Sequence, residues 1–175
     1  MTTDYFSVFD LPRRLALDTS DLQQRFYERT RVNHPDRFAG KSAMEQQRAL
    51  DVTSSLTDGY RVLRDPVQRA EYLLKLEGFD NTQQRGKDVP PELLDEVFEL
   101  NMMLEDAASN KSELEDARSR FEQMLHRADC DLESEFRHYD SSPDRSVLTV
   151  IRAILNRRRY IQNLLRDVGK ALASS

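Results

Sequence analysis

The chain has 175 residues, enough for one compact domain or two small ones. Charged residues make up 33% of it, whereas it holds only 5 glycines and 6 prolines, a profile that favours a helical protein over a β-sandwich. The net charge of −5 argues against general nucleic-acid binding.

The first predicted element is a short helix. The evidence for it is an apolar cluster that ends before Pro12: Tyr5, Phe6, Val8, Phe9 and Leu11. A longer helix follows, because Asp18, Thr19 and Ser20 are good N-cap residues and Leu22 and Phe26 recur at helical spacing. Pro35 ends this helix, because the residue before a proline avoids the α region.

A second long helix is predicted over residues 43–64, with Ser42 as its cap. Its apolar positions recur every three to four residues: Ala49, Val52, Leu56, Tyr60 and Leu63. The loop 33–42 joins it to the preceding helix, so the two form an antiparallel hairpin. Asp65 and Pro66 suit the cap and first position of one more helix, which runs to about Leu76.

A domain boundary is predicted after this helix, because the stretch 77–91 combines glycine, asparagine, glutamine and two prolines. We expect an N-terminal domain over residues 1–76, a linker over 77–90 and a second domain over 91–175. Residues 1–76 carry 12 Lys and Arg against 11 Asp and Glu, net +1, and the remainder carries 14 against 20, net −6. The two parts therefore favour different partners.

The second domain is predicted to hold three helices, over residues 91–108, about 112–138, and from the Ser142-Pro143-Asp144 cap signature to about 172. The middle helix has apolar residues at near-heptad spacing: Leu114, Ala117, Phe121, Leu125, Ala128, Leu132 and Phe136. Short connections make neighbouring helices antiparallel. The expected fold is all-α, with an antiparallel three-helix bundle at the C-terminal end.

The residues do not favour an enzyme. His126 and His138 lie twelve residues apart on one predicted helix, with no nucleophile paired to either. The chain has one cysteine, Cys130, so neither a disulfide framework nor a cysteine-rich metal site is expected. No glycine-rich phosphate loop is present. We expect no catalytic residue, no metal and no cofactor.

The expected location is the cytoplasm. A chain with one cysteine suits a reducing compartment. The N-terminal MTTDYFSVFD lacks the basic and long apolar regions of a secretory signal, and no apolar run approaches the roughly 18 residues that span a bilayer. Neither a membrane nor a nucleic acid is an expected partner.

The loop between the two long helices holds the tripeptide His34-Pro35-Asp36, which by itself suits a plain turn equally well. Its context is more specific: a short aromatic helix precedes the hairpin, and the signature Asp65-Pro66-x-x-Arg69-Ala70-x-Tyr72 opens the helix after it. Over residues 4–76 this pattern resembles the J domain of J-type co-chaperones, with Asn33 where a tyrosine usually precedes the tripeptide. The resemblance implies a helical hairpin with two short flanking helices, which docks on a DnaK-type chaperone and stimulates its ATPase.

The residues expected to contact that chaperone are His34, Pro35, Asp36, Arg25, Arg29 and Arg37. Proline fixes one φ angle, so the loop loses less entropy on docking. Asp36 is suited to accept charge-assisted hydrogen bonds, and the arginines are suited to steer the loop toward an acidic surface. For Arg25 and Arg29, an ordinary solvated helix face is the alternative.

The helix predicted over 91–108 has more apolar residues than one bundle face needs. Its core stripe consists of Leu93, Val97, Leu100, Leu104 and Ala107, whereas Leu94, Phe98 and Met102 lie off it among acidic residues. A wide core stripe or packing against the J domain would explain the surplus. A binding surface for a partner with an apolar and basic patch would explain it as well.

A J domain, a short linker and an acidic three-helix bundle together resemble the HscB family, the J-type co-chaperones of bacterial iron–sulfur cluster assembly. The resemblance implies that the bundle binds the cluster scaffold protein IscU and that the J domain delivers it to the specialised chaperone HscA. The scaffold-binding residues it implies are Leu94, Phe98, Glu99, Met102, Asp106 and, on the last helix, Ile154 with Ala153 as the alternative. The other readings are a J-type co-chaperone for a different client and a helical interaction protein without a chaperone partner.

Overall fold

The computed structural model describes residues 4–79, 98–105 and 110–174. Across these ranges the regular structure is entirely helical, which confirms the predicted all-α fold class. The chain divides into two compact units, Met1–Gly78 and Phe79–Ser175. Most of the predicted linker 77–90 lies outside the described residues, so its extent stays a prediction.

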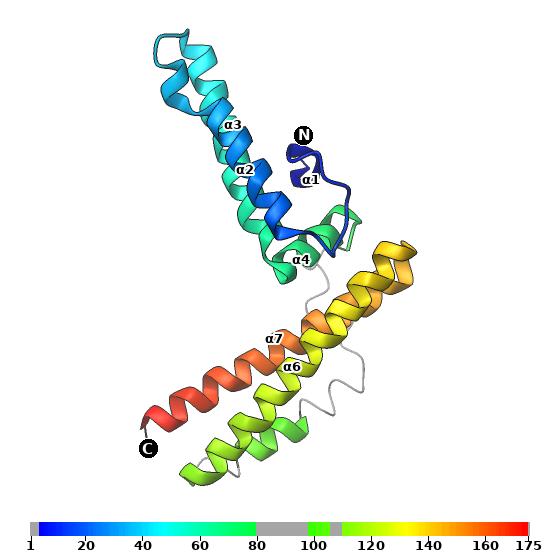
Figure 1. Ribbon diagram of the computed structural model, residues 1–175. Helices are drawn as coiled ribbons and strands as arrows, with labels where there is room; N and C mark the ends of the chain where they lie inside the picture. The colour runs from blue at the N-terminus through cyan, green and yellow to red at the C-terminus, as the bar shows by residue number, and fades with distance from the viewer. Residues whose placement is uncertain (1–3, 80–97, 106–109, 175) are drawn as a thin grey trace. The chain divides into compact units, whose positions relative to one another are not determined.

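The first unit is built on an antiparallel hairpin of α2 (Thr19–Asn33) and α3 (Ala43–Arg64), which lie side by side in Figure 1. Both helices begin where the sequence provides a cap. The Asp18 side chain accepts two backbone N–H groups of the first turn of α2. At the start of α3, Ser42 and Glu45 form a reciprocal capping box, and the hydrogen bonds from Ser42 lower the pKa of the Glu45 carboxyl.

Two short helices complete the first unit, α1 (Tyr5–Val8) and α4 (Pro66–Leu76). α4 begins at a proline, whose missing N–H has no intrahelical partner to lose at this position, and Asp65 caps it by accepting the backbone N–H of Gln68. Side chains from all four helices and from the α1–α2 connection fill one core, among them Phe6, Phe9, Leu15, Leu22, Leu56, Leu63, Leu73 and Leu74.

Arg69 is the buried charged residue of the described chain, with 4% of its surface exposed. Its Nε donates to the carbonyl oxygen of Leu15 at 2.8 Å. Its Nη1 donates to the carbonyl oxygen of Leu63 at 2.6 Å. A buried carbonyl needs a donor, so one guanidinium satisfies carbonyl groups of two segments far apart in the sequence, the α1–α2 connection and the end of α3.

Tyr72 fixes α1 against α4. Its hydroxyl accepts the backbone N–H of Tyr5 at 2.9 Å, and its ring stacks on that of Tyr5 with centroids 4.8 Å apart. Burial of the phenol raises the pKa of Tyr72. The signature that opens α4 is therefore a set of structural residues: a cap, a helix-starting proline, a buried guanidinium and an aromatic hydroxyl.

The second unit contains α6 (Lys111–Ser141) and α7 (Arg145–Ser174), two long helices that pack together along their length (Figure 1). Residues 98–105 are helical as well, and we refer to them as segment 98–105. All three contribute to one apolar cluster of buried residues: Leu100, Ala117, Phe121, Ile161, Leu164 and Val168. The arrangement agrees with the predicted three-helix bundle.

The structure corrects several details of the sequence interpretation. α6 extends one residue before and three residues beyond its predicted range of about 112–138. α7 begins at Arg145, after the predicted start at the Ser142-Pro143-Asp144 signature, and ends two residues beyond the predicted end at about 172. Pro143 lies before α7 rather than inside its first turn, and Asp144 is the cap, since its carboxylate accepts the backbone N–H of Ser146 at 2.6 Å. Hydrogen bonds from Ser146 lower the pKa of that carboxyl. Val52, expected among the apolar core positions of α3, is exposed, whereas Ala49, Leu56 and Leu63 of the same helix are buried.

Phe79 anchors the start of the second unit to α7. Its ring is buried and lies 4.6 Å from the guanidinium carbon of Arg145. The guanidinium carbon of Arg152, two turns along α7, lies 5.5 Å from the same ring. Both distances are within the range of a favourable cation–π contact.

Replacement of Arg69 by methionine tests the role of the buried guanidinium. Arg69→Met keeps an apolar stem but leaves the carbonyl groups of Leu15 and Leu63 without this donor, and we expect it to lower the free energy of unfolding by roughly 2–5 kcal/mol. Urea unfolding followed by circular dichroism measures the change. Arg61→Met, at an exposed arginine of α3, is the matched control, and equal midpoints for the two variants would contradict the assignment.

Gly59 tests the close approach of α1 to α3. A Cβ there would lie 3.0 Å from Phe9 Cε2 and 3.1 Å from Tyr5 Cδ1, so we expect Gly59→Ala to destabilise the chain by roughly 1–3 kcal/mol. At Gly169, in α7, nothing beyond the adjacent residues and the backbone of its own helix lies within 4 Å of the Cβ position, so Gly169→Ala is expected to stabilise by about 0.5–1 kcal/mol through helix propensity. Thermal unfolding of both variants measures the pair, and shifts of the same sign would refute the packing argument.

Candidate functional site

The predicted chaperone-contact loop forms a short, well-defined turn at the tip of the hairpin. His34 ends α2 in an extended conformation, and η1 (Pro35–Phe38) is a single 3-10 turn that begins at the proline. The backbone N–H of Asp36 donates to His34 Nδ1 at 3.3 Å, and that of Arg37 donates to the His34 carbonyl oxygen at 2.9 Å. The loop is therefore preorganised by local hydrogen bonds as well as by the proline.

The side chains of this turn face solvent. The His34 side chain is 52% exposed and the Asp36 carboxylate side chain 89% exposed, with His34 Nδ1 3.5 Å from Asp36 Oδ2. Arg37 is exposed beside them. An exposed, acceptor-bearing turn on a fixed backbone offers a binding surface, because its groups are not committed to the core and its shape is set before a partner arrives.

Polar side chains of α2 and α3 hold the tip in place. The Thr53 hydroxyl donates to the Asn33 carbonyl oxygen at 3.1 Å, and the Asn33 amide donates to the Arg29 carbonyl oxygen at 2.8 Å. Gln46 Nε2 donates to the carbonyl oxygens of Ala39 and Lys41 at 3.2 and 3.0 Å. Sequence reasoning missed Thr53 and Gln46, since a lone Thr or Gln on a helix carries no local signal of a distant acceptor.

Arg25 and Arg29 have an intramolecular role. Arg25 Nε lies 3.0 Å from both carboxylate oxygens of Asp21, and its Nη1 donates to the Phe9 carbonyl oxygen at 3.1 Å. Arg29 pairs with Asp10, a residue in the left-handed region with φ 51°. These arginines join the end of α1 to α2, and both stay partly exposed. Their role in chaperone contact stays a prediction.

The described residues offer no sign of a metal site, since no group of three or more His, Cys, Asp or Glu side chains among them is placed to hold an ion. Cys130 is exposed, with its Sγ 3.8 Å from His126 Nε2 on the same face of α6. Within the described part of the chain no helix is long and apolar enough to cross a membrane.

The predicted scaffold-contact residues are divided by the structure. Leu94 and Asp106 lie outside the described residues. On segment 98–105, Phe98 is 66% and Met102 45% exposed, and Glu99 is exposed as well. Ile154 is half-buried on α7, as is Ala153.

The exposure of Phe98 and Met102 follows from helix geometry. Leu100 is only 7% exposed, and Met103 and Leu104 pack against the same core, so the inward face of the segment is already supplied. Phe98 and Met102 are therefore not part of a wide core stripe, which was one of the explanations considered for the surplus apolar residues. Large apolar side chains that a fold leaves in solvent are candidates for partner contact.

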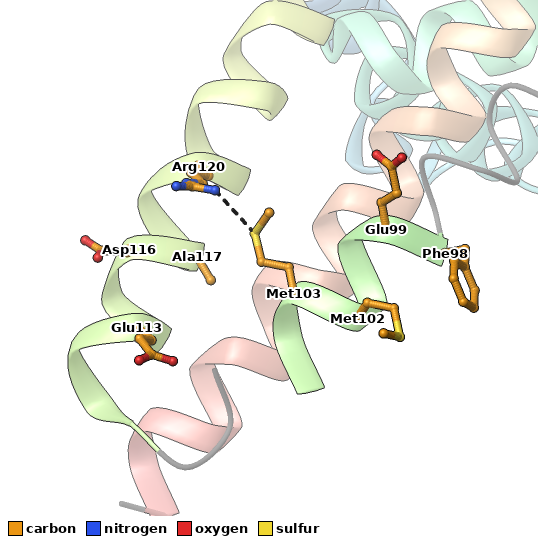
Figure 2. A pocket seen from close by; sticks show the side chains of 8 residues that line it. All are labelled: Phe98, Glu99, Met102, Met103, Glu113, Asp116, Ala117 and Arg120. Atoms are coloured by element: carbon orange, nitrogen blue, oxygen red, sulfur yellow. Dashed lines mark hydrogen bonds between the residues drawn. The ribbon is translucent and has the colours of Figure 1, made fainter. Parts of the chain in front are cut away.

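A groove of about 500 Å³ lies between segment 98–105 and α6 (Figure 2). One side of it is lined by Phe98, Glu99, Met102 and Met103, and the other by Glu113, Asp116, Ala117 and Arg120. Sequence reasoning identified three residues of the first side and none of the second. In sequence, Glu113, Asp116 and Arg120 are ordinary solvated positions and Ala117 is a predicted core position, so only the three-dimensional packing brings the four to the site.

Comparison with known proteins agrees with both units. The family described as HSCB C-terminal oligomerisation domain matches residues 89–169. The co-chaperone protein HscB homolog of Azoarcus sp. (strain BH72) is 32% identical over 171 residues, which cover 97% of this chain and 93% of that protein. The co-chaperone protein HscB of Proteus mirabilis (strain HI4320) is 38% identical over 126 residues, 69% of this chain and 72% of its own length.

Two solved structures extend the likeness to the fold. Chaperone HscB from Vibrio cholerae superposes with a TM-score of 0.69 at 25% identity, covering 98% of this chain and 99% of that one. Human co-chaperone protein HscB gives a TM-score of 0.73 at 27% identity, covering 96% of this chain and 81% of the human one. With an antiparallel hairpin that carries a His-Pro-Asp turn, a helical second unit and a relative matched over nearly its whole length, the chain belongs to the HscB family of co-chaperones.

Proposed function

We propose that this co-chaperone serves iron–sulfur cluster assembly by joining two proteins. Its second unit binds an IscU-like cluster scaffold, and its first unit presents that scaffold to a specialised DnaK-type chaperone of the HscA kind and stimulates the chaperone's ATPase. The chain is a regulator of a partner enzyme and works in the cytoplasm. The observation that carries the proposal is the pairing, on one chain, of an exposed His34-Pro35-Asp36 turn with an exposed apolar face at Phe98 and Met102.

The physical state of the turn supports chaperone contact. A carboxylate that is 89% exposed loses its hydration on docking, and a guanidinium or ammonium of the partner would repay that cost through charge-assisted hydrogen bonds. Because the backbone of the turn is held by the Thr53 and Gln46 hydrogen bonds, docking orders little of the loop. Arg37 beside it adds positive charge that favours an acidic partner surface.

The exposed apolar face supports scaffold contact. Phe98 offers a large ring to a partner pocket, and aromatic side chains are frequent anchors in protein interfaces. The Met102 thioether adapts its shape to the surface it meets. Glu99 adds a charged rim, which contributes to partner selection more than to affinity.

A J-type co-chaperone for a different client is the second candidate. The same turn and the same apolar face would serve it, since neither identifies the client by itself. Titration with a purified IscU-like scaffold separates the two, because only the first candidate requires binding.

His34→Gln tests the turn. We expect it to abolish stimulation of the partner chaperone's ATPase while scaffold affinity stays unchanged, because the imidazole lies in the first unit and is half exposed. Steady-state ATP hydrolysis with and without scaffold is the measurement. His138→Gln, at a similarly exposed histidine of α6, is the control, and stimulation that survives in His34→Gln would remove the turn from the mechanism.

Phe98→Ser with Met102→Ser tests the apolar face. We expect scaffold binding to weaken by roughly 2–5 kcal/mol, whereas the free energy of unfolding changes by less than about 0.5 kcal/mol because both side chains are exposed. Leu100→Ala, in the same segment but buried, should instead destabilise the fold by about 2–5 kcal/mol. Isothermal titration calorimetry and urea unfolding provide the two readouts.

Met44→Ser, an exposed apolar residue of the first unit, is the control for loss of surface hydrophobicity. If the Phe98 and Met102 variant bound the scaffold as tightly as this control did, segment 98–105 would not belong to the interface.

A further inference from the structure

We propose that the groove between segment 98–105 and α6 is a two-walled docking site. One segment of the scaffold contacts both walls. Its apolar side chain packs on Phe98 and Met102, and its basic residues bind the carboxylates of Glu113 and Asp116 on the α6 wall. The inference rests on the proposed function and specifies the chemistry of its partner: one apolar side chain flanked by lysine or arginine.

The α6 wall is one continuous helix face. Glu113, Asp116, Ala117 and Arg120 are spaced by three, one and three residues, so they share a face of the helix. Ala117 is only 2% exposed and belongs to the buried cluster that includes Leu100. Its small side chain forms the floor of the groove and leaves room between the longer acidic and basic side chains on either side of it.

The opposite wall is apolar with one acid. Figure 2 shows Met103 pointing from segment 98–105 toward Arg120, whose Nη1 lies 4.0 Å from the Met103 sulfur. Phe98 and Met102 lie on the same segment farther from α6 in this view. An occupant that packs on Phe98 and Met102 would thus meet charged groups of α6 only if it extended across the groove.

The charge of the groove selects the occupant. Among the described residues, three carboxylates line it, those of Glu99, Glu113 and Asp116, against one guanidinium, that of Arg120, so these lining residues have a formal net charge of −2. A basic and apolar segment would gain both contact and attraction, whereas an acidic one would face repulsion. A second copy of this chain is disfavoured as occupant, because a symmetric contact would place two such acidic grooves against each other.

The carboxylates of α6 are tested by neutralisation. Glu113→Gln with Asp116→Asn keeps size and hydrogen-bonding shape but removes two charges. We expect the dissociation constant for a purified IscU-like scaffold to rise roughly fivefold to thirtyfold at low salt, and the salt dependence of binding to become shallower. Glu28→Gln with Asp51→Asn, the same two changes at exposed positions of α2 and α3 in the other unit, is the matched control and should bind as the unaltered chain does.

The opposite charge gives an independent test. Arg120→Gln removes the groove's guanidinium, so we expect scaffold binding to tighten by roughly twofold to fivefold at low salt. A variant that is merely misfolded would not bind more tightly. Weaker binding in Arg120→Gln would mean that this face of α6 acts through packing and not through charge, which would overturn the inference.

The outcomes separate the inference from the function on which it rests. If Phe98→Ser with Met102→Ser bound the scaffold weakly but Glu113→Gln with Asp116→Asn bound it as the control does, the proposed role of the α6 wall would be overturned. The proposed scaffold-binding function would stand. A scaffold that fails to bind the unaltered chain would overturn both. Sedimentation of the unaltered chain and of Glu113→Gln with Asp116→Asn tests the remaining occupant: a dimer that this variant strengthens would assign the groove to a second copy and overturn the inference.

Discussion

The guanidinium of Arg69 is the constraint on which the first unit depends. It is buried, and it donates to the carbonyl groups of Leu15 and Leu63, which belong to segments far apart in the chain. Loss of either acceptor would leave the buried guanidinium with fewer hydrogen bonds, and loss of the guanidinium would leave two buried carbonyl groups without this donor. α4, which carries Arg69, also carries Tyr72, whose hydroxyl accepts the backbone N–H of Tyr5 in α1.

The two surfaces of the chain differ in how they are held. The His34-Pro35-Asp36 turn is exposed but tightly braced, by its own 3-10 hydrogen bonds and by Thr53 and Gln46. The Phe98 and Met102 face is exposed on a helix whose inner residues, such as Leu100, supply the core. In both cases the residues that fix the backbone are distinct from those that meet solvent, so substitutions at the surface separate binding from folding.

Much of the fold was predictable from sequence because local capping residues mark where its helices begin. Asp18, Ser42 and Asp65 cap where expected, since capping depends only on local geometry. The roles of Arg25 and Arg69 were not predictable in the same way, because their acceptors are backbone carbonyls that no residue type reveals. The groove shows the same limit: Phe98 and Met102 stood out against the helical periodicity of their own segment, whereas Glu113 and Asp116 became site residues only through the packing of a second helix.

Phe79 determines where a fragment that contains only the second unit should begin. Its ring lies against the guanidinium groups of Arg145 and Arg152, so the second unit includes a residue that precedes the predicted start of the bundle at residue 91. In a fragment that begins after residue 79, Arg145 and Arg152 would lose this aromatic partner, and the buried ring beside the first turns of α7 would be missing. Expression of the second unit alone should therefore start at or before Phe79, the first residue of that unit.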